Sequence, residues 1–207
     1  MRVLKKYENN PVISPVKMPR DVLYTFNPGA IKVNGEYIMI MDVTTLDDIH
    51  RFWIARSKDG YNFTPDPEPM KMPPPDLVYW GNSRPVMYKG KTFRDGFKMG
   101  SGAVPIKTDK GWLEIYHAVS TTCNSFIYRL KACLLDLEKP WEIIGHSDFI
   151  LWPEHDYEMC GRVANVVFTC NAIPEEDGSV KIYYGASDTN IGLAEGKISE
   201  LVELCLK

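Results

Sequence analysis

The sequence predicts an all-β protein of the β-propeller class. Aromatic and β-branched residues come in short runs separated by Gly, Asn, Asp and Pro, which is typical of antiparallel strands. Three times the chain repeats an apolar strand, a turn containing glycine and a second aromatic strand, and a third short strand follows each hairpin. Repeated units of three or four such strands are typical of propeller blades, although an antiparallel sandwich uses the same strands and turns.

The first unit begins with the hairpin around Asn34-Gly35, which lies between AIKV and EYIMIMDV. Both turn residues favour the positive φ that a two-residue hairpin requires. RFWIARS (51–57) is the expected third strand, and residues 58–63 form a turn into an outer strand. The stretch 64–77 is rich in proline, which removes donors from a strand ladder, so we expect it to cross the surface between blades.

The second and third units repeat this order. Lys110-Gly111 lies between AVPIKT and WLEIYHAV, and Asp177-Gly178 lies between NVVFTCNAI and SVKIYYGAS. The expected third strands are FIYRLKACLLD (126–136) and TNIGLAEG (189–196), and LEKPWEII resembles the turn into an outer strand. The ending ISELVELCLK predicts a short amphipathic helical turn. Together these elements predict one β-propeller-type domain over residues 1–207.

Composition excludes several classes of function. The 207 residues carry a formal net charge of -3 and no long basic run, so nucleic acid is a poor first hypothesis for a partner. No run of about 18 apolar residues occurs, so no membrane partner is expected. The start of the chain lacks the apolar stretch of a signal peptide, and we expect a cytoplasmic protein. The five cysteines contain no CxxC pair, which argues against a metal or redox site.

Polar residues beside the inner strands are the candidates for a site, because a propeller brings these strands together around one axis. Asn27 precedes a proline, so we expect an extended backbone with the amide directed into a central pocket, or else a capping turn. Lys98 precedes the small residues 100–102, which let a ligand approach the backbone, and His117 ends the aromatic strand of the same unit. The two could bind one anion, although a lone strand histidine is often a hydrogen-bonded structural residue.

Two further segments carry carboxylates. Asp188 directly follows the aromatic run YYGAS, where its carboxylate could accept two hydrogen bonds from sugar hydroxyls. Aromatic rings beside it would suit the apolar face of a pyranose. Asp156 and Glu158 lie before Gly161, and these carboxylates could simply be solvated.

Seven segments resemble glycoside hydrolase family 130, the mannoside phosphorylases and related mannosidases, and they follow the family's order. They are FNPGAIKVNGEY (26–37), IARSKDGYNF (54–63), LVYWG (77–81), FKMGSGAVPIKTDKGWLEIYHAV (97–119), ACLLDLEKPWEIIG (132–145), YEMCGRVANVVF (157–168) and KIYYGASDTNIGLA (181–194). The resemblance covers most of the chain, and it implies a five-bladed β-propeller.

The resemblance also implies an activity. Phosphorylases of this family cleave β-mannosides with inorganic phosphate and inversion, and release mannose 1-phosphate. It implies that Lys98 and His117 contact phosphate, that Asp188 binds the mannosyl unit, and that Asn27 borders the sugar site. The implied partners are a small oligosaccharide and phosphate as co-substrate, with no cofactor.

The chain departs from the family pattern between residues 63 and 77. The family's catalytic acid lies in a Glu-Asp-Pro-Arg segment of its second blade, and the sequence contains no such segment. LVYWG, which resembles the end of the third blade, follows the proline-rich stretch almost at once. We therefore expect about three blades and a partial one, lacking the second blade and most of the third.

The missing acid leaves the activity open. Asp42 ends a strand where the family usually has arginine, and it is the candidate replacement for the acid, ahead of Asp76, which we expect to be exposed. Asp42 could instead pair with Lys98 and prevent phosphate binding. The alternative function is a catalytically inactive relative that binds carbohydrate or phosphate. A homo-oligomer is also open, because incomplete propellers leave sheet edges unpaired.

Overall fold

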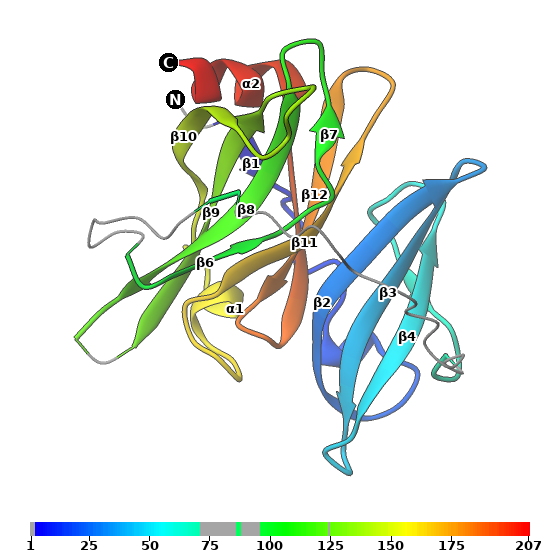
Figure 1. Ribbon diagram of the computed structural model, residues 1–207. Coiled ribbons are helices and arrows are strands. Elements are labelled where there is room, and N and C mark those ends of the chain that lie inside the picture. The colour runs from blue at the N-terminus through cyan, green and yellow to red at the C-terminus, as the bar shows by residue number, and fades with distance from the viewer. Residues whose placement is uncertain (1–2, 71–85, 88–95, 124) are drawn as a thin grey trace, which may run out of the picture.

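The computed structural model describes residues 3–70, 86–87, 96–123 and 125–207, and it arranges their strands in three antiparallel sheets (Figure 1). We call the sheets blades A, B and C in chain order. Blade A consists of β2 (Val22–Val33), β3 (Glu36–Thr45), β4 (His50–Ser57) and β5 (Thr64–Pro65). Blade B consists of β6 (Lys98–Ser101), β8 (Trp112–Thr121), β9 (Phe126–Leu135) and β10 (Ile143–Leu151), with β7 (Ile106–Lys107) also paired with β8. Blade C consists of β11 (Val167–Pro174), β12 (Ser179–Ala186), β13 (Asn190–Lys197) and β1 (Leu4–Lys6).

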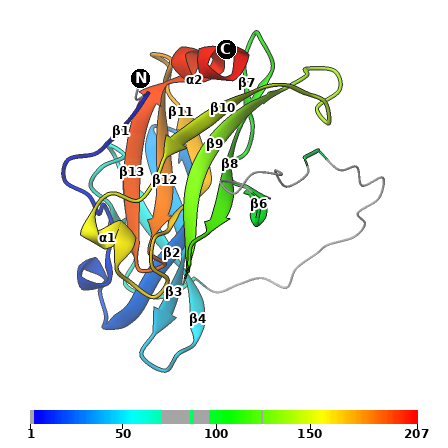
Figure 2. The ribbon, with the colours of Figure 1, turned by 90° about the vertical axis from the view of Figure 1, so that its left-hand side faces the viewer.

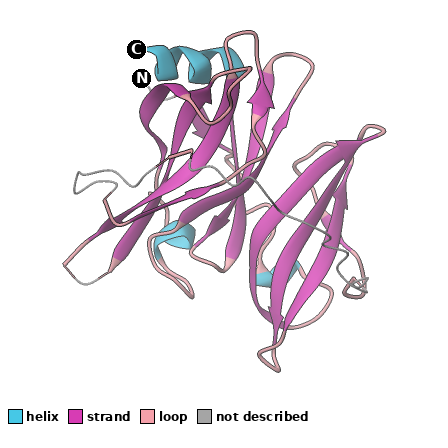
Figure 3. Cartoon of the chain, in the orientation of Figure 1, coloured by secondary structure: helices cyan, strands magenta, loops and turns pink. Residues whose placement is uncertain are grey.

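The hairpins form where the sequence predicts them. Asn34 and Gly35 have φ of 51° and 80°, and the strands on either side pair from Val33 and Glu36 onward. The three predicted third strands correspond to β4, β9 and β13. The prediction of an all-β protein built from repeated antiparallel units is confirmed, and Figure 3 shows how little of the chain is helical.

The fourth strand of blade C comes from the other end of the chain. β1 pairs antiparallel with β13, with Leu4 opposite Gly196. A side chain at Gly196 would lie 2.4 Å from the Val3 carbonyl oxygen, so this approach depends on glycine. The sequence patterns gave no sign of this pairing, because β1 is three residues long and lies far from β13 in the chain.

Blade C lies between the other two blades in Figure 1, and Figure 2 gives the same strands in a view turned by 90°. Alternate residues of its strands face opposite ways. Ile182 and Tyr184 belong to the core shared with blade B, which also contains Leu113 and Leu134. Tyr183 belongs to the core shared with blade A, which also contains Met39, Met41 and Trp53. All of these side chains are buried, so both faces of blade C are covered.

Three short helices complete the described structure: η1 (Pro15–Lys17), α1 (Asp156–Met159) and α2 (Ile198–Leu206). α2 corresponds to the predicted amphipathic ending, and it buries Leu201, Val202 and Cys205 against the core of blades B and C. None of the helices in the described ranges is long and apolar enough to cross a membrane.

The proline-rich stretch begins at a sheet edge. Pro65 lies in β5 opposite Ala55, on the outermost strand of blade A, where a missing backbone donor is tolerated. LVYWG (77–81) and Asp76 lie outside the described residues, and so does the partial blade that we expected there.

Candidate functional site

The candidate residues lie at one end of the blades, where the first strand begins and the second ends. Phe26 pairs with Asp42 in blade A, Lys98 pairs with Val119 in blade B, and Val167 pairs with Ala186 in blade C. The hairpin tips beyond these second strands lie toward the bottom of Figure 1. The antiparallel meander therefore gathers Asn27, Asp42, Lys98, His117 and Asp188 at this end.

His117 is the most unusual side chain at this end. It is only 4% exposed, its ring lies 4.3 Å from that of Phe168, and both of its ring nitrogens are buried without a hydrogen-bond partner among the described residues. Burial, and then the charge of Lys98, lower the pKa of His117 to about 4. The imidazole is therefore neutral near pH 7, and it can donate one hydrogen bond to an anion. A structural histidine would be expected to form hydrogen bonds through its ring, and His117 forms none with the described residues.

Lys98 lies on the same side of blade B as His117. It is two residues from Gly100, which is directly opposite His117, so the two side chains leave β6 and β8 on one face. The Lys98 Nζ lies 5.9 Å from the centre of the Tyr128 ring, and the His117 ring lies 6.0 Å from the same ring. Lys98 is exposed. The predicted pair is thus brought together.

Gly100 makes room for the His117 imidazole. A Cβ on Gly100 would lie 2.5 Å from His117 Cε1 and 2.6 Å from Nε2, closer than any real contact. We expect Gly100→Ala to lower the free energy of unfolding by about 1–3 kcal/mol, as overpacking does. In a protein that already carries His117→Ala, Gly100→Ala should change the free energy of unfolding very little, because the ring that the new methyl group would contact is absent. Urea unfolding of the four proteins in this double-mutant cycle measures both costs, and equal costs in the two backgrounds would contradict this account.

Asp188 lies in the tight turn that follows β12. Ser187 and Asp188 both have φ of 49°, and the carboxyl of Asp188 is partly buried. Burial raises the pKa of Asp188, and the charge of Arg162 opposes that rise. The loop before β11 holds this turn in place through two hydrogen bonds. The backbone N–H of Arg162 donates to Thr189 Oγ1 at 3.0 Å, and the backbone N–H of Val163 donates to the Ser187 carbonyl at 3.2 Å.

Arg162 is a site residue that the sequence patterns did not single out. Its guanidinium carbon lies 5.1 Å from the centre of the Tyr24 ring and 5.8 Å from that of Phe26, both in blade A. Its NH1 donates to Thr44 Oγ1 at 3.3 Å. A cation from blade C therefore lies on aromatic rings of blade A, next to Asp188. Its place in the segment YEMCGRVANVVF was the available signal, but only the packing of the two blades shows what it contacts.

The expected backbone of Asn27 is wrong. Its φ is 49°, in the left-handed region, and not extended. The pairing of β2 with β3 shifts between Phe26 and Gly29, so Asn27 and Pro28 form an irregularity in the strand. Asparagine adopts this conformation more readily than most residues, which is why it tolerates the bend. The Asn27 nitrogen lies 3.6 Å from where a Cβ on Gly185 would be, so blade A approaches blade C here.

Asp42 is not placed beside Lys98. Its carboxylate oxygens lie 3.0 and 3.1 Å from His50 Nδ1, and its side chain is 19% exposed. Asp42 alternates with Met41 and Val43, which face blade C, so it lies on the opposite face of blade A. The predicted competition between Asp42 and Lys98 does not occur within the described residues of one chain.

Comparisons with known proteins support the sequence resemblance. A family model described as beta-1,4-mannooligosaccharide phosphorylase matches residues 70–207. The beta-1,4-mannooligosaccharide phosphorylase of Ruminococcus albus is 34% identical over 174 residues, which cover 83% of this chain and 47% of that protein. The 1,2-beta-oligomannan phosphorylase of Thermoanaerobacter sp. is 38% identical over 169 residues, 79% of this chain and 47% of that protein. The chain thus spans about half the length of these curated relatives.

Solved structures support the fold. The beta-1,2-mannobiose phosphorylase of Listeria innocua superposes with a TM-score of 0.81 at 22% identity, over 98% of this chain and 99% of that one. At this level of identity the likeness concerns the fold alone.

Proposed function

Since the chain belongs to glycoside hydrolase family 130, the family of the mannoside phosphorylases, we propose that it binds a β-mannoside together with inorganic phosphate and transfers the mannosyl unit to phosphate. The product would be mannose 1-phosphate, formed with inversion. The names of the relatives support the substrate class, and the arrangement of Asn27, Lys98, His117 and Asp188 supports the site.

The observation that carries this proposal is the environment of His117. Its two buried nitrogens lack partners within the described ranges, and a lysine lies on the same face. A buried polar group without a partner is costly, so its presence favours a ligand that supplies one. Phosphate fits, because a neutral imidazole donates one hydrogen bond and the Lys98 ammonium supplies the opposite charge.

The mannosyl unit would lie at the site end of blades A and C. Asp188 offers carboxylate oxygens to sugar hydroxyls, and Asn27 comes close to the same blade. Arg162 favours the ionised form of Asp188, and the rings of Tyr24 and Phe26 offer an apolar surface. In the reaction a phosphate oxygen attacks the anomeric carbon, the bond to the leaving sugar oxygen breaks, and that oxygen takes a proton from a carboxylic acid.

A second candidate function is binding without turnover. It is favoured by the absence of the Glu-Asp-Pro-Arg segment from the sequence, and by the contact of Asp42, the candidate acid, with His50. Incubation with a β-mannosyl disaccharide, with and without phosphate, separates the two functions. Release of mannose 1-phosphate only with phosphate supports the phosphorylase, and free mannose without phosphate indicates a hydrolase. Binding of both ligands by folded protein without any release supports the inactive relative.

Lys98→Met and His117→Ala should each weaken phosphate binding by about 10- to 100-fold. This range corresponds to the loss of one hydrogen bond to a charged group. Isothermal titration with inorganic phosphate measures it. The matched control is Lys107→Met, because Lys107 lies in the same blade and contacts Trp112 away from His117. If Lys98→Met binds phosphate as tightly as Lys107→Met, the anion site is assigned to the wrong residues.

A further inference from the structure

Asp42 and His50 form a carboxylate–imidazole pair at the site end of blade A, and we call these two residues the dyad. The Asp42 carboxylate oxygens lie 3.0 and 3.1 Å from His50 Nδ1. A carboxylate only accepts hydrogen bonds, so Nδ1 donates to it and Nε2 is left for another partner. The His50 side chain is 48% exposed, and its ring packs edge-on against Phe26, with the ring centres 5.7 Å apart. Asp42 thus orients an imidazole that remains accessible.

Arg162 connects the dyad with the sugar site of blade C. Its guanidinium carbon lies 5.8 Å from the centre of the Phe26 ring, the same ring against which His50 packs. Its NH1 donates to Thr44 Oγ1 at 3.3 Å, and Thr44 is directly opposite His50 in the sheet. The charge of Arg162 also acts on the carboxyl of Asp188. One guanidinium therefore lies near both the dyad and the residue expected to bind the mannosyl unit, although the dyad leaves blade A on the face turned away from blade C.

The order of the blades places the proton donor of the reaction in blade A. In a transfer with inversion, phosphate attacks the anomeric carbon from one side and the leaving oxygen departs on the other. Lys98 and His117 belong to blade B, and Asp188 lies at the end of blade C, which packs between blades B and A. With phosphate on the side of blade B, the leaving oxygen would be on the side of blade A, where the dyad lies.

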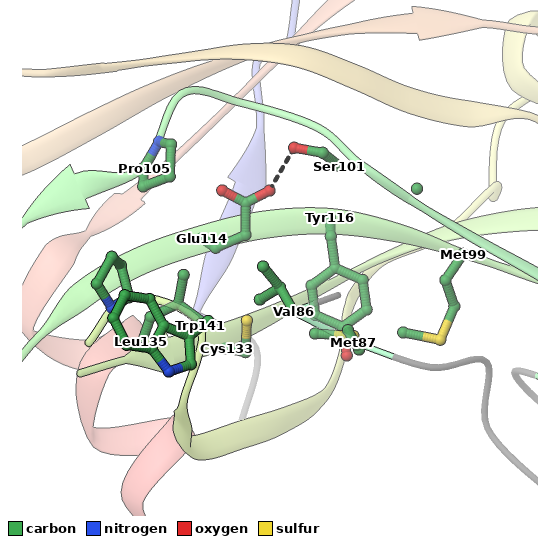
Figure 4. Close-up of a pocket in the computed structure, with 12 residues that line it drawn as sticks. Val86, Met87, Met99, Ser101, Pro105, Glu114, Tyr116, Cys133, Leu135 and Trp141 are labelled. Carbon is green, nitrogen blue, oxygen red and sulfur yellow. Dashed lines mark hydrogen bonds between the residues drawn. The ribbon is translucent and has the colours of Figure 1, made fainter. Parts of the chain in front are cut away.

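Two other carboxyl groups are poorly suited to this role. Burial raises the pKa of Glu114, so it can hold a proton. However, it leaves β8 on the face opposite to His117, in the pocket of blade B, where its Oε1 accepts a hydrogen bond from Ser101 Oγ at 2.7 Å (Figure 4). Asp47 lies at the site end of blade A, but the Arg51 guanidinium binds both of its oxygens and holds its pKa well below the usual range, so Asp47 has no proton to give near pH 7.

We propose that protonated His50, oriented by Asp42, gives its Nε2 proton to the oxygen of the leaving sugar, an inference that rests on the proposed function. A phosphate oxygen forms a bond to the anomeric carbon while the bond from that carbon to the leaving oxygen breaks. The electron pair of the broken bond stays on the leaving oxygen, which takes the proton from Nε2, and the neutral imidazole regains a proton from solvent. Histidine suits this role because it is the side chain that exchanges a proton near neutral pH.

Asp42 is then a positioning residue and not the acid itself. The sequence made it the candidate replacement for the acid, but both of its oxygens are directed at His50 Nδ1. A carboxylate in this position fixes the orientation of the ring and the nitrogen that carries the shared proton, as it does in a catalytic triad. The imidazole thus takes the part that a carboxylic acid plays in the general mechanism.

The test compares two β-mannosides that differ in their need for a proton donor. A β-mannosyl disaccharide releases a sugar oxygen that must be protonated, whereas 2,4-dinitrophenyl β-mannoside releases a stable phenolate that needs no proton. With inorganic phosphate as acceptor, His50→Gln should lower kcat for the disaccharide by about 10²- to 10⁴-fold, the usual contribution of a general acid, and leave kcat for the dinitrophenyl substrate nearly unchanged. Asp42→Asn should show the same split between the two substrates. The control is His146→Gln, an exposed histidine of β10, which should match the wild type on both.

The outcomes separate this assignment from the proposed function. If His50→Gln releases mannose 1-phosphate from the disaccharide as fast as the wild type, the assignment of His50 is wrong and the phosphorylase stands. Equal losses on both substrates, in protein that circular dichroism shows to be folded, also overturn the assignment. A wild type that uses only the dinitrophenyl substrate transfers mannosyl units to phosphate without a working acid, which again excludes His50. A wild type that transfers neither overturns both proposals.

Discussion

Lys6→Met is expected to lower the free energy of unfolding by about 3–5 kcal/mol, because it leaves a buried carboxylate without its cation. The Lys6 Nζ lies 2.6 Å from Glu158 Oε2, and the two side chains are 6% and 0% exposed. The same ammonium donates to the Trp152 carbonyl at 2.9 Å. Methionine fills a similar volume but supplies neither charge nor donor.

Glu158 cannot move away from the lost partner. Its Oε2 accepts hydrogen bonds from the backbone N–H groups of Glu154 and His155 at 2.7 and 3.0 Å, and its Oε1 accepts one from the Tyr184 hydroxyl at 2.8 Å. The expectation that this carboxylate is solvated is therefore wrong. These contacts fix the Glu158 side chain between α1 and blade C, where it binds Lys6 of β1.

Equilibrium urea unfolding measures the effect, and Lys5→Met is the matched control. Lys5 is the preceding residue of β1, and its side chain is exposed. A surface substitution of this kind changes stability by about 0.5 kcal/mol or less. If Lys6→Met and Lys5→Met have the same unfolding midpoint, the buried pair does not stabilise the closure of blade C.

His117 is expected to make the protein less stable as the pH falls from about 6.5 to about 4. Burial lowers its pKa to about 4 in the folded state, and an unfolded histidine titrates near 6.5. The unfolded state therefore takes up the proton first. Above pH 6.5 the stability is fully present, and by pH 4 roughly 3 kcal/mol of it is lost.

Comparing the wild type with His117→Gln isolates this loss, because the carboxylates that also titrate in acid are the same in both proteins. The difference in unfolding free energy should change by roughly 3 kcal/mol between pH 7 and pH 4, in buffers without phosphate. His146→Gln, which removes an exposed histidine of blade B, is the control for a lost surface group. If the unfolding free energies of His117→Gln and the wild type changed in parallel with pH, His117 would have the same pKa in the folded and unfolded states, and the prediction would be wrong.

The sequence was informative wherever the determining interactions are local. The Asn34-Gly35 turn needs two residues that accept positive φ, and such residues are readable from the sequence. The alternation that buries Met39 and Met41 is readable in the same way. The backbone of Asn27 was misjudged, because the proline rule describes the average residue and not one in a strand irregularity.

The candidate site was predicted only in part. The residue types at positions 98 and 117 indicated an anion site, since a lysine and a histidine on one hairpin share a face. The burial of His117 could not be predicted, because Phe168 from another blade covers it. Arg162 was missed for the same reason, as its contacts lie on a blade more than 100 residues away in the chain, with Thr44 separated from it by 118 positions.

By itself the sequence determined the three repeated strand units, their turns, and the segments that match the family's motifs. Turn preferences and alternation act over a few residues, so the position and register of each hairpin can be read from its own segment. The tertiary structure alone decided that β1 completes blade C, that Lys6 contacts Glu158 across 152 positions, and that blade C packs against both other blades. These outcomes depend on which apolar faces of distant segments pack together, and no local pattern specifies that choice.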